Sequence, residues 1–176
     1  MTDLRTGGIA TLLLLAAGCT PTFRPLEASW ATRSELATAD YSLTEQDRNF
    51  GAAQVWLAEP DPDSRRVRLG IRLRNEGSSP LRLDLEDTEL ELRTEDGRLL
   101  VVAEIEAFLG DQVFAPQRTS RSELVFVLPE DLTLGDLVGF ELVWAVASED
   151  GARLTRSTPF ARETWREARA RSYYGR

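Results

Sequence analysis

The chain contains no histidine and no lysine, and its single cysteine lies at position 19. All 21 basic side chains are therefore arginines, which stay protonated at physiological pH and serve poorly as bases or nucleophiles. These absences exclude Ser-His-Asp catalysis, histidine-based metal sites, Schiff bases, a serine–lysine dyad and P-loop chemistry. A disulfide within the chain is excluded too, because it needs a second cysteine.

Charge is unevenly distributed along the sequence. The net charge is −8, and an acidic protein lacks the basic surface that nucleic acids require. Residues 162–176 run against this trend, with five arginines and two glutamates. We therefore expect no nucleic-acid partner, and we treat the basic C-terminal segment as a separate feature.

The N-terminus carries a short apolar run, residues 9–17, after a weakly cationic lead. A transmembrane helix needs about 20 apolar residues, so this run is too short to span a bilayer. A charged lead, a short apolar run and small residues before a cut are typical of an export signal. The run leads into the sequence Leu15-Ala16-Ala17-Gly18-Cys19.

These residues resemble the lipobox of bacterial lipoproteins, in which the cysteine becomes the lipidated first residue of the mature chain. The resemblance implies that residues 1–18 are a signal peptide and that lipid on Cys19 anchors the protein to a membrane. The alternative is an ordinary signal peptide followed by an incidental cysteine. Position 20 is threonine, whereas an aspartate there commonly retains lipoproteins at the inner membrane. The resemblance thus implies the cell envelope, and in a Gram-negative source the outer membrane, facing the periplasm.

Residues 19–47 show no sustained periodicity and are rich in Thr, Ala, Ser and charge. This composition predicts a tether. Its apolar side chains lead us to expect that part of it docks on the following domain: Trp30, Leu36, Tyr41 and Leu43.

A period of two begins at Gly51, which is typical of strands with one buried face. It predicts strands over residues 52–58, 66–74, 81–85, 87–94, 99–103, 119–128, 138–147 and 153–157. Asp96-Gly97 and Asp150-Gly151 predict tight turns, and residues 99–103, apolar on both faces, predict a central strand. The sequence therefore predicts an all-β, antiparallel sandwich of seven to eight strands over residues 48–160.

Fold-level motifs in this region resemble the small immunoglobulin-like sandwich found in bacterial lipoproteins of unknown function. They comprise a first hairpin over residues 66–85 centred on Leu73-Arg74-Asn75, the turn Glu95-Asp96-Gly97-Arg98, and the segments Val127-Leu128-Pro129 and Phe140-Glu141-Leu142-Val143-Trp144. The resemblance implies an architecture and supplies no catalytic residues.

Arginines alternate along one predicted strand and form an outward stripe: Arg66, Arg68, Arg72 and Arg74. The stripe is either a contact for an anion or a glycan, or a solvated face paired with Glu89, Glu91 or Glu123. Trp56 alternates away from its apolar neighbours, which predicts an exposed aromatic, whereas Trp144 shares a face with core residues.

Two acidic clusters, Asp61 with Asp63 and Asp84 with Glu86 and Asp87, offer oxygen ligands of the kind calcium prefers. Neither cluster has EF-hand spacing, and Pro–Asp repeats are ordinary loop chemistry. We predict no metal and no cofactor.

Residues 161–176 form a basic tail, of which residues 161–171 have helix-favouring composition. We predict a short C-terminal helix here, with Trp165 as a docking residue. The alternative is contact with anionic lipid, lipopolysaccharide or a partner through the basic and aromatic side chains of Arg162, Trp165, Arg166, Arg169, Arg171, Tyr173 and Tyr174.

The leading hypothesis is a lipid-anchored interaction or accessory module of the cell envelope, without catalytic activity. Its partner would be an envelope protein or an anionic lipid or glycan. The alternatives are a hydrolase of envelope glycans that uses a pair of carboxylates, and a sandwich that binds a small ligand or calcium at its loops.

Overall fold

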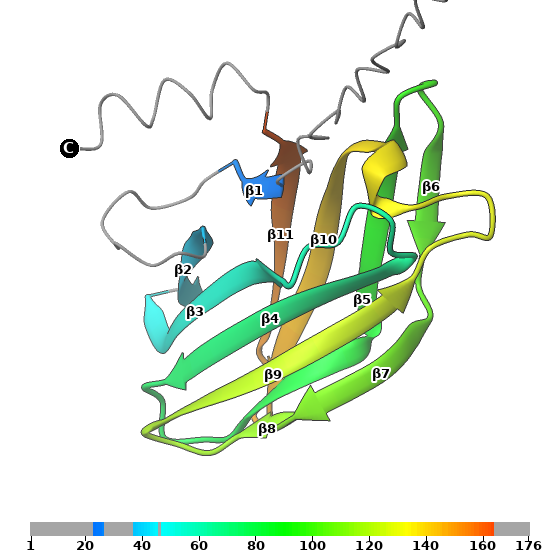
Figure 1. Cartoon of the computed structure of the whole chain (residues 1–176). Helices are drawn as coiled ribbons and strands as arrows, with labels where there is room; N and C mark the ends of the chain where they lie inside the picture. The colour runs from blue at the N-terminus through cyan, green and yellow to red at the C-terminus, as the bar shows by residue number, and fades with distance from the viewer. Residues whose placement is uncertain (1–22, 27–36, 46, 164–176) are drawn as a thin grey trace, which may run out of the picture.

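The computed structural model describes residues 23–26, 37–45 and 47–163, and this part of the chain is all-β (Figure 1). It holds eleven strands and one short 3₁₀ turn, η1 (Leu134–Asp136). The strands are β1 (Phe23–Pro25), β2 (Thr38–Glu45), β3 (Arg48–Ala58), β4 (Arg66–Asn75), β5 (Leu81–Thr94), β6 (Leu99–Val102), β7 (Ile105–Gly110), β8 (Val113–Phe114), β9 (Arg118–Val127), β10 (Leu137–Ser148) and β11 (Arg153–Arg162).

The strands form two antiparallel sheets. Sheet A has the order β1-β11-β10-β5-β6, with β8 also paired to β5, and sheet B has the order β2-β3-β4-β9-β7. One shared core contains buried side chains from both sheets, so the sheets pack face to face. The predicted all-β, antiparallel fold is confirmed.

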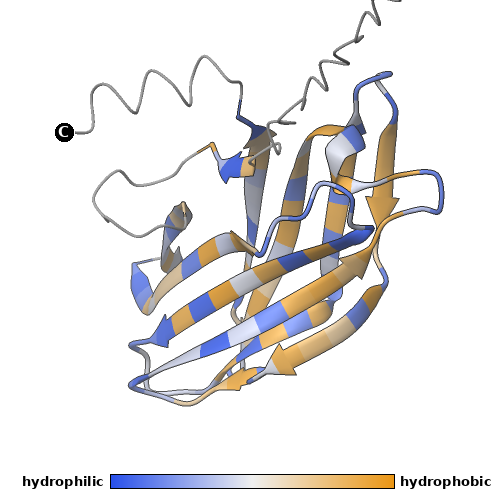
Figure 2. Cartoon of the chain, in the orientation of Figure 1, coloured by the Kyte–Doolittle hydropathy of each residue, from blue (hydrophilic) through white to orange (hydrophobic). Residues whose placement is uncertain are grey.

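Alternation along each strand produces this layering. On β4, Val67, Leu69, Ile71 and Leu73 are fully buried, and the arginines between them point to the outer face of sheet B. The same alternation is visible as blue and orange bands along β4 in Figure 2. Successive side chains of a strand point to opposite faces of the sheet. The alternation of apolar and polar residues therefore decides which face of the sheet is buried.

Trp144 lies at the centre of the core, as predicted from its strand neighbours. Its side chain is fully buried, and its Nε1–H donates a hydrogen bond of 3.0 Å to Oγ1 of Thr158 on β11. Tyr41 of β2 meets the indole edge-to-face, with ring centroids 5.6 Å apart. This contact joins the edge strand of sheet B to the middle of sheet A.

The sandwich has two distinct ends. At the β1 end, Gly135 in η1 donates to the carbonyl of Pro62, and Arg162 donates to the carbonyl of Gly135. At the opposite end, called here the far end, the β2–β3 hairpin meets the β10–β11 turn through an ion pair between Arg48 and Asp150. The β1 end is uppermost in Figure 1.

Several expectations about strand pairing were wrong. The predicted hairpin over residues 66–85 is a crossing between sheets, because β4 pairs with β3 and β9 whereas β5 pairs with β10, β6 and β8. The predicted strands at 81–85 and 87–94 form one long strand, β5, with a register shift against β10.

The expected central strand at 99–103 is the edge strand β6, so its apolar outer side chains face solvent. The turns at 96–97 and 150–151 do connect paired strands, as predicted.

The boundaries of the domain also differ from the expectation. Residues 38–45, assigned to the tether, form β2, and residues 23–25 form β1 on the edge of sheet A. Ala161 and Arg162, assigned to a C-terminal helix, end β11, because they pair with Arg24 and Phe23 of β1. Glu163 is described and is not helical, and the rest of the predicted helix, residues 164–171, lies outside the described residues. So do Trp30 and Leu36, whereas Leu43 is fully buried in the core.

Candidate functional site

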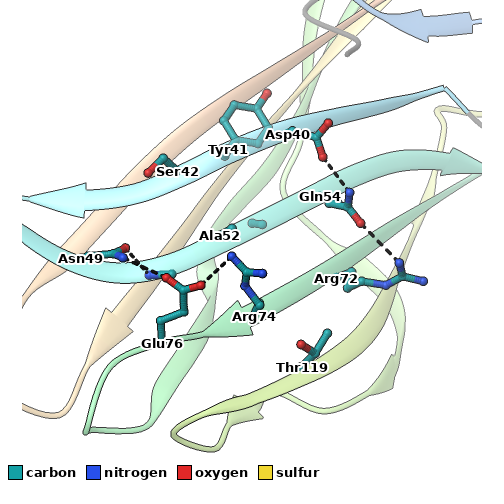
Figure 3. A pocket seen from close by; sticks show the side chains of 12 residues that line it. Asp40, Tyr41, Ser42, Asn49, Ala52, Gln54, Arg72, Arg74, Glu76 and Thr119 are labelled. Carbon is teal, nitrogen blue, oxygen red and sulfur yellow. Dashed lines mark hydrogen bonds and ion pairs between the residues drawn. The ribbon is translucent and has the colours of Figure 1, made fainter. Parts of the chain in front are cut away.

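A groove of about 590 Å³ lies on the outer face of sheet B, where β2, β3, β4 and β9 run side by side (Figure 3). Most of the residues that line it are of polar type, with two arginines of the predicted stripe on one side and β2 on the other. It is lined by Asp40, Tyr41, Ser42, Asn49, Gly51, Ala52, Ala53, Gln54, Arg72, Arg74, Glu76 and Thr119.

The hollow results from small residues in the middle of the sheet. Ala52 stands between Ser42 on β2 and Arg74 on β4 in the register, so short side chains form the floor and longer ones the rim. Next to it, Gly51 has φ +128°, and a Cβ there would stand 1.9 Å from the carbonyl oxygen of Arg74. Only glycine allows this close approach of the two backbones.

One rim of the groove is a chain of hydrogen bonds across three strands. Nε2 of Gln54 donates to Oδ1 of Asp40 at 2.7 Å, and Arg72 donates to Oε1 of Gln54 at 3.4 Å. Arg72 therefore has a neutral partner, and it forms no ion pair with another described residue. Its register partner on β9 is a second cation, Arg121. Arg121 is itself paired with Glu123 at 2.6 Å and does not line the groove. Arg72 is therefore the side chain of this rim at which an added anion would be stabilised most.

The other rim lies nearer the far end and is neutralised internally. Arg74 pairs with Glu76 at 2.5 Å, and Nδ2 of Asn49 donates to the same carboxylate at 2.8 Å. The groove thus places an unneutralised cation at one side and a paired cation at the other.

The remaining arginines of the stripe lie outside the groove and are paired. Arg66 forms two hydrogen bonds to Glu106, and this contact lowers the pKa of Glu106 below its ordinary value. Arg68 pairs with Glu59 at 2.8 Å and lies 4.0 Å from Glu123. Of the partners expected from the sequence, only Glu123 is correct. Glu89 and Glu91 are on β5 in the other sheet.

Trp56, predicted to be exposed, is only 4% exposed although it lies on the outer face of sheet B. Its indole lies over Gly70, where an added Cβ would stand 2.1 Å from Cε2. Arg121 covers the other side, with its guanidinium carbon 4.8 Å from the ring centroid. The prediction was wrong because a glycine on β4 and an arginine on β9 enclose the ring.

The acidic clusters serve local structure. Oδ1 of Asp61 accepts a hydrogen bond from the backbone N–H of Asp63, an ordinary turn contact. Asp84 and Asp87 both pair with Arg153 of β11. Among the described residues, no group of three or more acidic, histidine or cysteine side chains is placed to hold a metal ion.

The residues expected to contact lipid or a partner fall mostly outside the described part of the chain. This holds for Cys19 and for six residues of the tail: Trp165, Arg166, Arg169, Arg171, Tyr173 and Tyr174. Arg162 is described, and its guanidinium pairs with Glu95 at 2.5 Å. Arg162 therefore fastens β11 to the β5–β6 hairpin.

Sequence reasoning missed the half of the groove that β2 supplies. Asp40 and Ser42 point outward while Ala39 and Leu43 are buried, which is a period of two inside the region assigned to a tether. That alternation was the available signal. The contribution of Glu76 had no comparable signal, because it depends on the turn after β4.

Comparison with known proteins shows no relationship at the level of sequence. No family model matches the chain, and no curated protein matches it.

In the described residues, no helix has both the length and the apolar composition to cross a membrane.

Solved structures resemble the chain only weakly. A FixG-related protein from Vibrio parahaemolyticus is 9% identical, with 66% of this chain and 100% of that chain covered and a TM-score of 0.41. The structural genomics target SoR45 is 12% identical, with 74% and 86% covered and a TM-score of 0.38. The putative ApaA protein from Bordetella pertussis is 15% identical, with 72% and 89% covered and a TM-score of 0.37. At these scores the likenesses carry no information about function.

Proposed function

We propose that this protein is a lipid-anchored, non-catalytic interaction module of the cell envelope, built on an immunoglobulin-like sandwich. Lipid on Cys19 holds it at a membrane, in a Gram-negative cell the periplasmic face of the outer membrane. The groove on sheet B binds an anionic, hydroxyl-bearing partner, of which an envelope glycan is the simplest example. The observation that carries the proposal is the groove itself, an open polar hollow with one unneutralised arginine, Arg72.

The position of β1 supports the anchor. Phe23 pairs with Arg162 at the β1 end, and only three residues separate it from Cys19. An extended chain spans at most about 3.6 Å per residue, so lipid on Cys19 would keep the β1 end within roughly 14 Å of its attachment point. The protein would stand on this end, close to the membrane and without a long tether.

The position of the groove supports a binding role. Asn49 and Glu76 lie in the groove next to the β2–β3 hairpin and the turn after β4, both at the far end. A protein anchored through Cys19 therefore presents the groove away from the membrane. The two carboxylates in the lining, Asp40 and Glu76, already accept hydrogen bonds from Gln54 and Asn49, so part of their negative charge is compensated within the protein.

The anchor is tested by replacing Cys19 with serine in the full chain expressed in a bacterial envelope. We expect metabolic labelling with a radioactive fatty acid to be lost and the protein to move from the membrane fraction to the soluble fraction. The anchor would be disproved if the unaltered protein takes up no label. It would also be disproved if the Cys19→Ser variant is labelled as strongly as the unaltered protein.

The groove is tested with purified peptidoglycan as the probe, because it is a glycan that carries carboxylates. The detergent-solubilised full chain is sedimented with it, and Arg72→Gln is compared with Arg82→Gln. Arg82 is an exposed arginine on sheet A that makes no ion pair with a described residue. A hydrogen bond to a charged group is worth about 1.5–3 kcal/mol, so Arg72→Gln should weaken binding roughly tenfold or more. Equal binding by both variants, or none by the unaltered protein, contradicts the proposed ligand.

A further inference from the structure

An apolar and acidic patch lies on the outer face of sheet A at the β1 end. Exposed large apolar side chains gather there: Leu26 is 68% exposed, Leu99 73%, Val101 60% and Val138 39%. Figure 2 shows β6, which carries Leu99 and Val101, as apolar along its whole length. Most soluble proteins keep contiguous exposed apolar area small, so a gathering of this kind indicates a surface that something covers.

The centre of the patch is a hollow of about 130 Å³. In the register, Leu99, Arg93, Gly139 and Ala161 form one row across four strands. Gly139 has no side chain to fill that row, which leaves the hollow between β5 and β11. The hollow is open to a side chain that arrives from outside.

Acidic side chains lie beside the hollow. Glu91 and Glu141 are register partners on β5 and β10, and Glu89 follows on the same face of β5. None of the three forms an ion pair with a described residue. Two cations share the row: Arg93 on β5 and, beside Ala161, Arg24 on β1, which is paired with Glu163. Like charges placed opposite each other destabilise a sheet. A basic occupant would relieve that repulsion.

We propose that the C-terminal segment of this chain, residues 164–176, covers the patch. The segment begins directly beside it, because Ala161 belongs to the row that contains Leu99 and Arg162 ends β11. It holds four arginines, one glutamate and three aromatic residues, and so complements an apolar patch with three glutamates.

The segment is long enough to do so. Neighbouring strands are about 4.8 Å apart, so the row from Ala161 to Leu99 spans roughly 14 Å. Thirteen residues as a helix extend about 20 Å, and as extended chain more than twice that. An anionic membrane, one of the alternative partners of the basic tail, would instead be repelled from this patch by Glu91 and Glu141.

The test is disulfide trapping in the full chain. Ala168→Cys is combined with Val101→Cys in the patch or, as the control, with Asp63→Cys. Asp63 is exposed at the same end of the molecule as the start of the segment. Its neighbour Pro62 accepts a hydrogen bond from Gly135, and Gly135 in turn accepts one from Arg162. A segment that samples all directions reaches both positions, whereas docking raises the effective concentration at Val101. Mild oxidation followed by mass spectrometry of the cross-linked peptides identifies which cysteines have paired, whatever the state of Cys19.

We expect the pair with Val101→Cys to form in roughly fivefold excess over the control or more, as an effective-concentration effect. Arg166→Glu with Arg169→Glu should reduce that yield about threefold, and adding Glu91→Arg and Glu141→Arg should restore it. Equal yields for the two pairs would overturn the proposal, as would a yield that the charge reversals leave unchanged. Neither result bears on the lipid anchor or on the groove, which are tested separately.

Discussion

Trp56 and Gly70 face each other across β3 and β4, and the indole of one occupies the space that a side chain on the other would fill. This pairing flattens the ring against the outer face of sheet B, where Arg121 covers it. A tryptophan on an outer face is buried here without entering the core.

The pairing predicts that Gly70→Ala destabilises the protein. The added Cβ would stand 2.1 Å from Cε2 of Trp56, so the indole has to move and lose its contact with Arg121. Overpacking of this kind typically costs about 1–3 kcal/mol. Equilibrium denaturation gives the free energy of unfolding, and iodide quenching should show a larger accessible tryptophan fraction.

The same substitution in a Trp56→Ala background is the control. Without the indole nothing blocks the new methyl group, so Gly70→Ala should cost less there than in the unaltered protein. A cost that is the same in both backgrounds would show that the strain arises in the backbone of β4 and not at Trp56.

A second prediction concerns the crossing between the sheets after β4. Asn75 is buried, and its Nδ2 donates to the carbonyl oxygens of Ser79 and Phe114 while its Oδ1 accepts from the N–H of Gly77. Asn75→Ala leaves three backbone groups without this partner, and we expect a loss of roughly 2–4 kcal/mol in the free energy of unfolding.

Asn75→Asp keeps an acceptor for Gly77 and removes both donors. It should be at least as damaging as Asn75→Ala, because it buries a charge next to two carbonyl oxygens. If thermal and chemical denaturation find either variant as stable as the unaltered protein, these hydrogen bonds do not hold the crossing.

A third prediction concerns the hydrogen bond inside the core. Trp144→Phe removes the Nε1–H donor to Thr158 and leaves unfilled volume, which together should cost about 2–4 kcal/mol. Thr158→Val removes the other partner. Because the two changes share one bond, the double variant should cost less than the sum of the single ones in equilibrium denaturation. Strict additivity would mean that the bond contributes nothing of its own.

The sequence predicts the fold well where one strand face is buried. β4, β9, β10 and β11 follow from their alternation, and the two Asp-Gly turns follow from backbone preference. The sequence could not predict which sheet each strand joins or which strands are its neighbours. The residues 75–80 that read as a hairpin turn carry the chain from sheet B to sheet A, and periodicity is the same in both cases.

The candidate site was predicted by half. The alternating arginines of β4 mark the outer face on which the groove lies. The rest of the lining comes from β2, which is distant from β4 in the sequence, and from the short turn after β4. Tyr41 illustrates the difficulty. It belongs to a segment with the composition of a tether, and its place is decided by contact with Trp144, more than 100 residues away.

A last prediction concerns acid stability at the far end. Hydrogen bonds from Ser148 and Arg48 lower the pKa of Asp150 from 3.8 to about 2. Because the folded state binds this proton less tightly than the unfolded state, the carboxylate stabilises the fold above about pH 4, and this contribution is lost as the pH falls toward 2. The difference in unfolding free energy between the unaltered protein and Asp150→Asn should therefore be constant above pH 5 and shrink below pH 4.

Carboxyl-detected NMR titration separates the two causes of the lowered pKa of Asp150. Ser148→Ala should raise the pKa of Asp150 more than Arg48→Gln does, because the Ser148 hydrogen bond is the larger cause. The reverse order would mean that the ion pair between the β2–β3 hairpin and the β10–β11 turn, and not the turn itself, controls this carboxylate.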